Sequence, residues 1–429
     1  MNKDNRNVQL SELYDFQYGT GNTIENIGGD YSIYGSNGAV GYTNLYNSEN
    51  APVIGHIGAY AGIVNWASGK HFVTYNGVIC KIKKGINPRF GYYVLLNSKL
   101  QKRLRGSTQP FISYDLLNDV RVFLPKRVTQ DNIAFVLSAL DSKIELNNCI
   151  NGEIEAMAKM LYDYWFVQFD FPDANGKPYK TNGGKMVWNG ELKRKIPEGW
   201  DVQKMAEWLD IDKSGDWGKD EEEGNFTKKV ICFRGADING LNGLDELKPP
   251  IRYILEKNSF KILKSHDLII EISGGSPIQS TGRLAFITDA TIKRFKYPLI
   301  CSNFCKPVTI RNKKLLYNFT YYWNSLYDNG VFFGYEGKTS GIKNLLLDSF
   351  ISSYYTVVPE EKLVNQFYDF MDNIQEKKQT ALAENQKLTE LRDWLLPMLM
   401  NGQVKVKEAK EIISMAAEPE ADYIKENKK

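Results

Sequence analysis

Residues 116–166 read LLNDVRVFLPKRVTQDNIAFVLSALDSKIELNNCINGEIEAMAKMLYDYWF, and residues 350–400 read FISSYYTVVPEEKLVNQFYDFMDNIQEKKQTALAENQKLTELRDWLLPMLM. Each begins with a short alternating stretch, which indicates a strand, and this stretch ends at Pro125 or Pro359. A long pattern with helical period follows in both. The two stretches therefore form an internal repeat, and each copy predicts a strand followed by a long helix.

The repeat extends upstream of these stretches. YYVLLNSKL from Tyr92 resembles FTYYWNSLY from Phe319, and VQLSEL from Val8 resembles VQKMAEWL from Val202. The predicted organisation is a first module at 1–125, a long helix at 126–168, a linker at 169–200, a second module at 201–359, a long helix at 360–403 and a C-terminal tail at 404–429. The linker is dense in Gly, Pro and Asn, which break regular elements. The tail is charged and only weakly periodic.

The long helices carry apolar residues at heptad spacing. The first seam is Ile133, Leu137, Leu140, Ile144, Asn147, Asn151, Ile154, Ala158, Leu161 and Trp165, and the second is Phe367, Met371, Ile374, Lys378, Ala381, Asn385, Leu388, Arg392, Leu395 and Leu399. Each helix is roughly 58 Å long at about 1.5 Å per residue, which exceeds the width of a small domain. We expect the helices to pair antiparallel, with Asn147, Asn151 and Asn385 fixing the register. The alternative is that each helix packs only on its own module.

Composition excludes several classes of protein. The formal net charge is +3, so any nucleic-acid surface must come from local segregation of charge. Five cysteines and three histidines are scattered along the chain, which predicts neither a disulfide framework nor a metal site. The sequence has no long apolar run and no apolar stretch near Met1, so we expect a cytoplasmic protein that does not contact membranes.

Basic residues cluster at corresponding places in the two modules. The first cluster lies within 70–105, where no acidic residue occurs and aromatic residues are interleaved. The second lies within 290–320, which also lacks acidic residues. Such clusters neutralise phosphates, although a single charge run is more often a solvated face. Because the pattern recurs in both modules, it favours DNA as the ligand.

Base reading requires amide, hydroxyl and guanidinium groups on loops that reach groove edges. Such loops occur at 34–38, 106–109, 272–279 and 338–343, although each is also consistent with an ordinary turn. The candidate DNA-contacting residues are Ser36, Asn37, Lys70, Lys81, Lys83, Lys84, Arg89, Lys102, Arg103, Arg105, Thr108, Gln109, Ser276, Gln279, Arg283, Lys293, Arg294, Lys296, Arg311, Lys338 and Lys343.

No catalytic motif is complete. Gly337-Lys338-Thr339 resembles the end of a phosphate-binding loop, but Phe332 stands where the first glycine belongs. Asp267 and Glu271 flank a predicted strand as in a metal-dependent nuclease, but no lysine stands two residues after the glutamate. We therefore expect no catalytic residue and no bound metal. The alternatives are a nuclease that uses these carboxylates and a coiled-coil adaptor without DNA contact.

The chain resembles the specificity subunits of type I restriction-modification systems over nearly its whole length. The strings that carry this resemblance, in their order and spacing, are YGSNGAVGY (Tyr34–Tyr42), PVIGHIG (Pro52–Gly58), LYDYWF (Leu161–Phe166), FDFP (Phe169–Pro172), KMVW (Lys185–Trp188), IPEGW (Ile196–Trp200) and LLPMLMNGQ (Leu395–Gln403). The acidic stretch at 216–224 has no counterpart in this pattern.

The resemblance implies a mixed α/β (α+β) fold. Two strand-rich target-recognition domains would be joined by two long antiparallel coiled-coil helices, as a pseudo-two-fold internal repeat. Each domain would read one half of a split target in double-stranded DNA. The helices would dock two adenine-N6 methyltransferase subunits, which carry S-adenosylmethionine, and an endonuclease/translocase subunit that uses ATP and Mg²⁺ would join them. The chain itself would be non-catalytic and without a cofactor.

Overall fold

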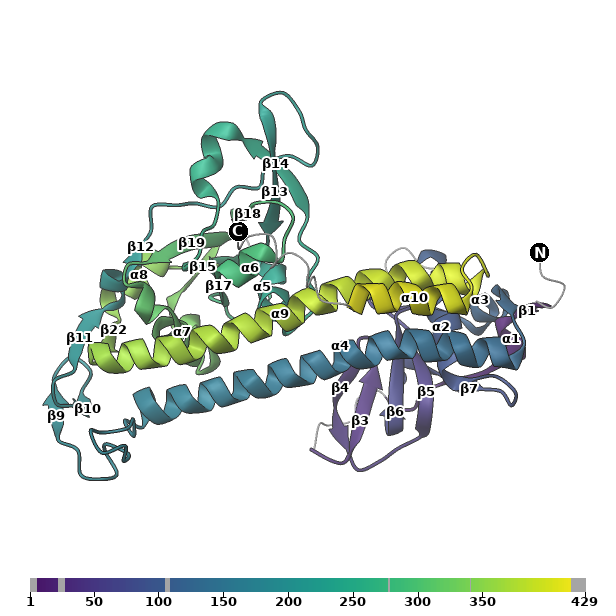
Figure 1. Cartoon of the computed structure of the whole chain (residues 1–429), viewed down its shortest axis with the longest axis horizontal. Helices are drawn as coiled ribbons and strands as arrows, with labels where there is room; N and C mark the ends of the chain where they lie inside the picture. Colours follow the sequence, from purple (N-terminus) through teal and green to yellow (C-terminus); the bar gives the residue numbers. More distant parts are fainter. Residues whose placement is uncertain (1–5, 22–27, 105–108, 277, 340, 418–429) are drawn as a thin grey trace, which may run out of the picture. The chain divides into compact units, whose positions relative to one another are not determined.

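A computed structural model describes residues 6–21, 28–104, 109–276, 278–339 and 341–417 (Figure 1). The chain divides into two compact units. Unit 1 consists of Met1–Glu145 and Gln386–Lys429, and unit 2 consists of Leu146–Asn385. Two long helices, α4 (Arg127–Tyr162) and α9 (Glu361–Met400), each contribute one segment to each unit.

Unit 1 is built on one large sheet. Its elements before α4 are β1 (Arg6–Gln9), α1 (Leu10–Leu13), β2 (Tyr14–Tyr18), β3 (Tyr31–Gly35), β4 (Gly38–Thr43), β5 (Ser48–Gly55), β6 (Val64–Val73), β7 (Gly77–Ile82), α2 (Pro88–Asn97), the 3₁₀ helix η1 (Leu100–Arg103), α3 (Tyr114–Asn118) and β8 (Arg121–Leu124). Six strands form a sheet in the order β2-β7-β5-β6-β3-β4, in which only the β3–β6 pair is parallel.

Local sequence explains how two elements of this unit begin. The β3–β4 hairpin turns at Ser36 and Asn37, and Gly38 after them has a φ of 81°, which favours glycine. Helix α2 begins at Pro88, where the side chain of Asn87 accepts a hydrogen bond from the backbone N–H of Phe90 (3.0 Å).

Unit 2 contains several smaller sheets. Its elements after α4 are the π-helical turn η2 (Asp163–Val167), β9 (Met186–Asn189), β10 (Arg194–Pro197), β11 (Asp201–Lys204), η3 (Met205–Trp208), β12 (Leu209–Asp210), β13 (Phe226–Phe233), η4 (Gly235–Asp237), α5 (Ile238–Leu241), β14 (Ile251–Leu255), η5 (Glu256–Lys261), β15 (Asp267–Glu271), β16 (Ser273–Gly274), β17 (Leu284–Phe286), α6 (Asp289–Lys293), β18 (Leu299–Cys301), β19 (Cys305–Ile310), η6 (Lys313–Leu315), α7 (Leu316–Asp328), η7 (Val331–Tyr335), β20 (Glu336–Thr339), β21 (Ile342–Leu345), α8 (Leu347–Ser353) and β22 (Tyr355–Val358). The larger sheets have the orders β12-β19-β15-β17, β14-β13-β18 and β16-β21-β20.

The internal repeat is visible in the elements themselves. In unit 1, β1 pairs antiparallel with β8, the strand directly before α4. In unit 2, β11 pairs antiparallel with β22, the strand directly before α9. The resembling segments that begin at Tyr92 and Phe319 lie on α2 and α7. Each module is therefore closed by a pair formed between its first and last strands.

The two long helices run antiparallel to each other within each unit. In unit 2, Asn147 contacts Asn385 and Glu155 contacts Lys378, so residue numbers rise along one helix as they fall along the other. In unit 1, the guanidinium of Arg392 donates to Asp141 (3.0 Å). The predicted antiparallel pairing is confirmed.

The helices also pack on their modules. In unit 1, Leu137 and Leu395 are fully buried in one core with Leu10 and Phe90 of the module. In unit 2, Phe367 packs against Phe166 at 4.9 Å between ring centroids and lies in a core with module residues. Pairing and packing on the modules therefore occur together, and the predicted fold class is confirmed.

Two segments have more structure than their composition suggested. In the predicted linker, β9 and β10 form an antiparallel hairpin. In the predicted tail, residues 406–417 form α10, whose Ala409 is buried in the unit 1 core. Among the described residues, no helix combines the length and the hydropathy that a membrane span requires.

Candidate nucleic-acid interface

The basic residues near the end of β7 differ in their surroundings. Lys81 on β7 and Lys84 in the turn that follows are exposed. Lys83 between them donates a hydrogen bond to the carbonyl oxygen of Ser11 (2.7 Å) and forms an ion pair with Asp15 (3.2 Å). Lys83 therefore holds β7 to the start of the module, whereas its two neighbours extend toward solvent.

Two further cations of the first module lie over aromatic rings. The Lys70 ammonium is 4.5 Å from the centroid of the Tyr46 ring, and the Arg89 guanidinium is 4.5 Å from that of Trp66. Such cation–π contacts restrict the side chains without neutralising their charge. Both cations therefore keep a positive charge next to a flat apolar surface.

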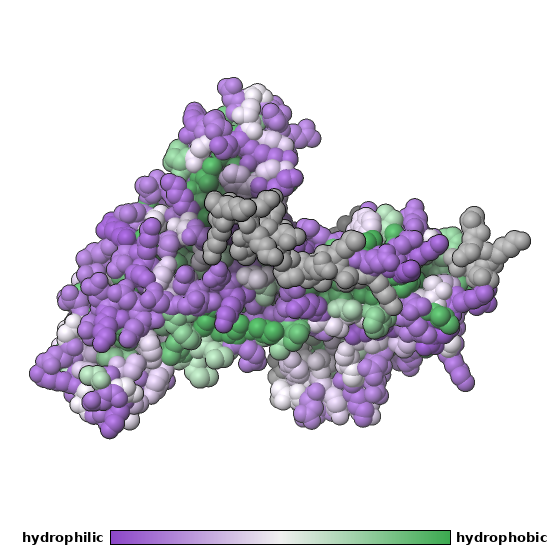
Figure 2. Space-filling model, in the orientation of Figure 1, coloured by the Kyte–Doolittle hydropathy of each residue, from purple (hydrophilic) through white to green (hydrophobic). Residues whose placement is uncertain are grey.

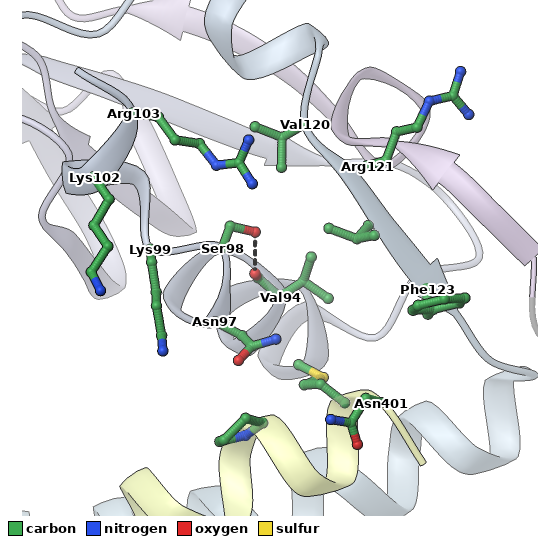
Figure 3. A pocket seen from close by; sticks show the side chains of 13 residues that line it. Val94, Asn97, Ser98, Lys99, Lys102, Arg103, Val120, Arg121, Phe123 and Asn401 are labelled. Carbon is green, nitrogen blue, oxygen red and sulfur yellow. Dashed lines mark hydrogen bonds between the residues drawn. The ribbon is translucent and has the colours of Figure 1, made fainter. Parts of the chain in front are cut away.

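A cavity of about 450 Å³ in unit 1 brings together two predicted residues, Lys102 and Arg103, with two cations that were not among the candidates, Lys99 and Arg121 (Figure 3). Lys99, Lys102 and Arg103 lie around one side of it, and Arg121 extends from β8 on the other side (Figure 3). Its apolar part comes from α2, β8 and the end of α9. No acidic side chain is found among the described residues that line it, so the cavity is electropositive.

The polar loops of the first module differ in how they are held. The Ser36 hydroxyl lies 2.9 Å from the carbonyl oxygen of Ile57 and 2.7 Å from that of Asn76. These contacts give the hydroxyl a role in stabilising the fold of the loop. Asn37 and Gln109 are exposed. Two further predicted residues, Arg105 and Thr108, lie outside the described residues.

Four predicted cations of the second module are held by partners inside unit 2. Arg283 binds Glu271 (2.7 Å), Arg311 binds Asp210 (2.7 Å), Lys343 binds Glu336 (3.1 Å) and Arg294 donates to the side chain of Gln379 (2.6 Å). The hydrogen bonds that Arg283 donates to Glu271 raise the pKa of Arg283, and burial lowers the pKa of Arg294 to about 10. Arg283 and Lys343 are mostly buried with their partners and stabilise the domain, whereas Arg311 is paired at an exposed position.

Three other predicted residues of the second module lie at exposed positions. Lys293 and Lys296 are exposed near the end of α6. Gln279 is exposed, and its backbone N–H donates to the hydroxyl of Ser276 (3.2 Å). Lys338 lies on β20, and its side chain falls outside the described part of the chain. The basic clusters thus occupy corresponding places in the sequence, but their side chains have different structural environments in the two modules. DNA contact by either cluster stays a prediction.

The predicted register residues meet in the helix seam of unit 2. The amide nitrogen of Asn147 donates to the side-chain oxygens of Asn385 (2.9 Å) and Glu384 (2.7 Å), and Asn385 donates to Asn148 (2.8 Å). Such buried amide contacts exist in only one register of the two helices. Asn151 is buried in the same seam, with no hydrogen-bond partner among the described residues.

Charged contacts across the seam were not predicted from the heptad pattern. The Lys378 ammonium lies 2.6 Å from a carboxylate oxygen of Glu155, and Arg392 contacts Asp141. Lys378 and Arg392 stand at seam positions, but Glu155 and Asp141 lie outside the heptad positions that begin at Ile133. A charged side chain in a helix seam requires a partner of opposite charge. The cations at seam positions therefore indicate acidic partners on the other helix, and this signal could have predicted both ion pairs.

Asp267 and Glu271, the carboxylates of the nuclease alternative, have separate partners. The Asp267 carboxylate binds the Lys213 ammonium (2.7 Å) and accepts from the Thr309 hydroxyl (2.6 Å). Glu271 is bound through both oxygens by Arg283. No group of three or more metal-ligating side chains occurs among the described residues.

Comparison with known proteins supports the resemblance read from the sequence. Residues 2–156 match the family model described as the type I restriction modification DNA specificity domain. The chain is 24% identical over 338 residues to the type I restriction enzyme MjaIX specificity subunit of Methanocaldococcus jannaschii, covering 76% of this chain and 71% of that protein. It is also 24% identical over 367 residues to the HindI specificity subunit of Haemophilus influenzae, covering 74% and 77%.

A solved structure shares the fold. The crystal structure of the type I restriction-modification S subunit from M. genitalium aligns with 93% of this chain and 97% of its own, with a TM-score of 0.54 and 17% sequence identity. The predicted similarity to type I specificity subunits is therefore confirmed.

The structure predicts that Arg283 stabilises unit 2 far more than an exposed cation does. Arg283→Ala would leave the buried Glu271 carboxylate without its partner and should lower the free energy of unfolding by about 3–5 kcal/mol. Lys293→Ala, at an exposed position, should change it by less than about 0.5 kcal/mol. Urea unfolding of both variants measures this difference, and equal losses would contradict the structural role of the pair.

Proposed function

We propose that this chain is the DNA-recognition subunit of a type I restriction-modification system, and that it reads a target in two separated halves. The observation that carries the proposal is the repeat itself: two modules, each closed by a strand pair in front of its own long helix. The similarity to specificity subunits supports DNA as the ligand.

In this proposal the paired helices set the distance between the two half-sites. At about 1.5 Å per residue, α4 is roughly 54 Å long and α9 roughly 60 Å. Successive faces of one DNA groove recur at about 34–36 Å. Helices of this length can therefore hold two readers one helical turn or slightly more apart.

DNA would be held by phosphate contacts and identified by base contacts. Exposed cations such as Lys81, Lys84, Lys102 and Arg103 are suited to phosphates, because they keep their charge and extend from the fold. Exposed amides such as Gln109 and Gln279 are suited to base edges.

The chain would carry no catalytic residue. The alternatives remain a nuclease that uses Asp267 and Glu271, and an adaptor that does not contact DNA.

Catalysis would belong to partner subunits that dock on the helices. In unit 2, α4 and the π-helical turn η2 that follows it present a stripe of apolar side chains that are 37–70% exposed: Leu146, Ile150, Met157 and Met160 on α4, and Tyr164 on η2. Together with Phe370 of α9, part of this stripe lines a groove of about 660 Å³. Figure 2 shows hydrophobic surface where the two helices run together in this unit. We assign this stripe to methyltransferase subunits, which would bring S-adenosylmethionine, while an endonuclease/translocase subunit would bring ATP and Mg²⁺.

Reversing two exposed charges should weaken DNA binding without changing sequence preference. The double variant Lys81→Glu, Lys84→Glu should lower affinity similarly for all duplexes and reduce the slope of log K against log salt by about 2, because each lost phosphate contact removes about one counterion. The matched control Lys180→Glu, Lys195→Glu changes the same charge at exposed positions outside the predicted interface. Fluorescence anisotropy over a salt series measures both. The adaptor alternative predicts no difference between the two variants.

Shortening both helices should shorten the gap between the half-sites. Deleting residues 148–154 and 378–384 removes one heptad from each helix and retains Asn147 opposite Asn385. The loss of about 10.5 Å corresponds to roughly three base pairs. Methylated adenines, mapped in DNA from cells that express the chain with its methyltransferase, should keep both half-sites and lose about three intervening base pairs. A continuous methylated site in the parent protein would overturn the two-part target.

Placing charge on the apolar stripe should prevent assembly with the methyltransferase. Met157→Glu, Met160→Glu should abolish co-purification, because two carboxylates would be buried at the interface without partners. Phe260→Glu, which adds a carboxylate at another exposed apolar position of unit 2, should not. Thermal unfolding of the double variant should remain close to that of the parent chain, since both methionines are exposed. Undiminished co-purification of the double variant would rule out this face as the docking surface.

A further inference from the structure

A second cavity, of about 630 Å³, lies in unit 2 and differs in character from the electropositive one. Its lining residues are Trp217, Arg234, Gly235, Ala236, Glu271, Ser273, Gly274, Gly275, Ser302, Asn303, Phe304 and Ile342. The volume lies within the range of cavities that hold small organic ligands. Most of the lining is apolar or glycine, and a carboxylate is part of it.

Aromatic side chains provide flat surface at this cavity. Phe304 is 55% exposed and Trp217 is 38% exposed, although both are large apolar groups. The Arg252 guanidinium lies 4.2 Å from the centroid of the Trp217 ring, and its Nε donates to the Trp217 carbonyl oxygen (2.8 Å). Trp217 is therefore held in place on the acidic stretch 216–224 and is positioned to stack on a planar ring.

The carboxylate of Glu271 is directed toward two glycines of the cavity. A β-carbon added at Gly235 would lie 2.7 Å from Glu271 Oε1, and one added at Gly274 would lie 3.5 Å from it. These two residues therefore place no β-carbon beside this oxygen, which is also in contact with the Arg283 guanidinium (2.7 Å). Arg283 binds both carboxylate oxygens, which leaves Oε1 a second lone pair for a donor from the cavity.

Ser302 provides a further polar group. It is 1% exposed, it lines the cavity, and its side chain is paired with the Cys305 thiol. The cavity thus combines aromatic stacking surface with the Glu271 carboxylate and with the polar side chains of Arg234, Ser273, Ser302 and Asn303.

We propose that this cavity binds a nucleobase ring that carries an exocyclic amino group, such as adenine or cytosine. The ring would stack on Phe304, the more exposed of the two aromatic side chains, and donate its amino hydrogens to Glu271 Oε1. Carbonyl-bearing analogues, hypoxanthine and uracil, would place an acceptor against the carboxylate and be rejected. The ring could come from a free nucleoside or from an unpaired base in DNA, and only the second source rests on the proposed function.

Free nucleosides test the chemistry of the cavity. Titration calorimetry of the full chain should show adenosine binding at least about 10-fold more tightly than inosine, since one well-placed hydrogen bond to a charged group accounts for such a factor. Phe304→Ala should weaken adenosine binding about 10-fold, because a base–aromatic stack is lost. Phe260→Ala, which removes an equally exposed ring elsewhere in unit 2, should have no effect.

Gly274→Ala is a second variant that the fold should accommodate. Its β-carbon would make ordinary contacts, 3.5 Å from Glu271 Oε1 and 3.5 Å from Thr281 Cγ2, and would stand between the carboxylate and a ligand. It should abolish the preference for adenosine over inosine. Equal binding of the two nucleosides by the parent chain, or identical behaviour of Phe304→Ala and Phe260→Ala, would overturn the proposal.

Duplexes with and without one unpaired adenine identify the source of the ring. Tighter binding of the bulged duplex, lost in Phe304→Ala, would assign the cavity to an extruded base, whereas adenosine selectivity without a bulge preference would assign it to a free nucleoside. Absence of both effects would overturn the proposal even if paired DNA binds normally. If paired DNA does not bind but adenosine selectivity persists, the proposed DNA-recognition function fails and the cavity proposal stands.

Discussion

The antiparallel pairing of α4 and α9 is the constraint on which the rest of this protein depends. The seam is apolar where Leu137 and Leu395 meet in unit 1, and polar where Asn147 meets Asn385 in unit 2. Apolar side chains tolerate a shift of register, whereas paired amides and the partly buried Lys378–Glu155 ion pair do not. The polar residues of the seam therefore hold the two helices in one register.

Each module is joined to its long helix in the same way. A strand pair, β1–β8 or β11–β22, brings the beginning of a module to the residue where its long helix begins. Apolar residues of the helices then complete the cores of both units. Because strand pairs and core residues carry the stability, the loops beyond them are free to differ between the two modules.

The two modules use this freedom differently. The first keeps exposed lysines on β7 and η1 and an electropositive cavity beside them. The second ties Arg283, Arg311 and Lys343 to carboxylates and presents an aromatic cavity with a carboxylate in its wall. A protein with two similar halves thus offers two chemically different surfaces, which suits a ligand whose two halves differ.

The sequence alone determined the repeat, the bounds of the long helices within a few residues and their apolar seams. Those features are local or periodic: Pro125 and Pro359 stop strands, and heptads mark a face wherever the partner helix lies. Tertiary structure alone decided which charged side chains are paired with one another. Arg311 meets Asp210, and Lys378 meets Glu155, across separations in the chain that no local pattern spans. It also decided the aromatic cavity, because Trp217, Glu271 and Phe304 come from three separate parts of the chain that only the fold brings together.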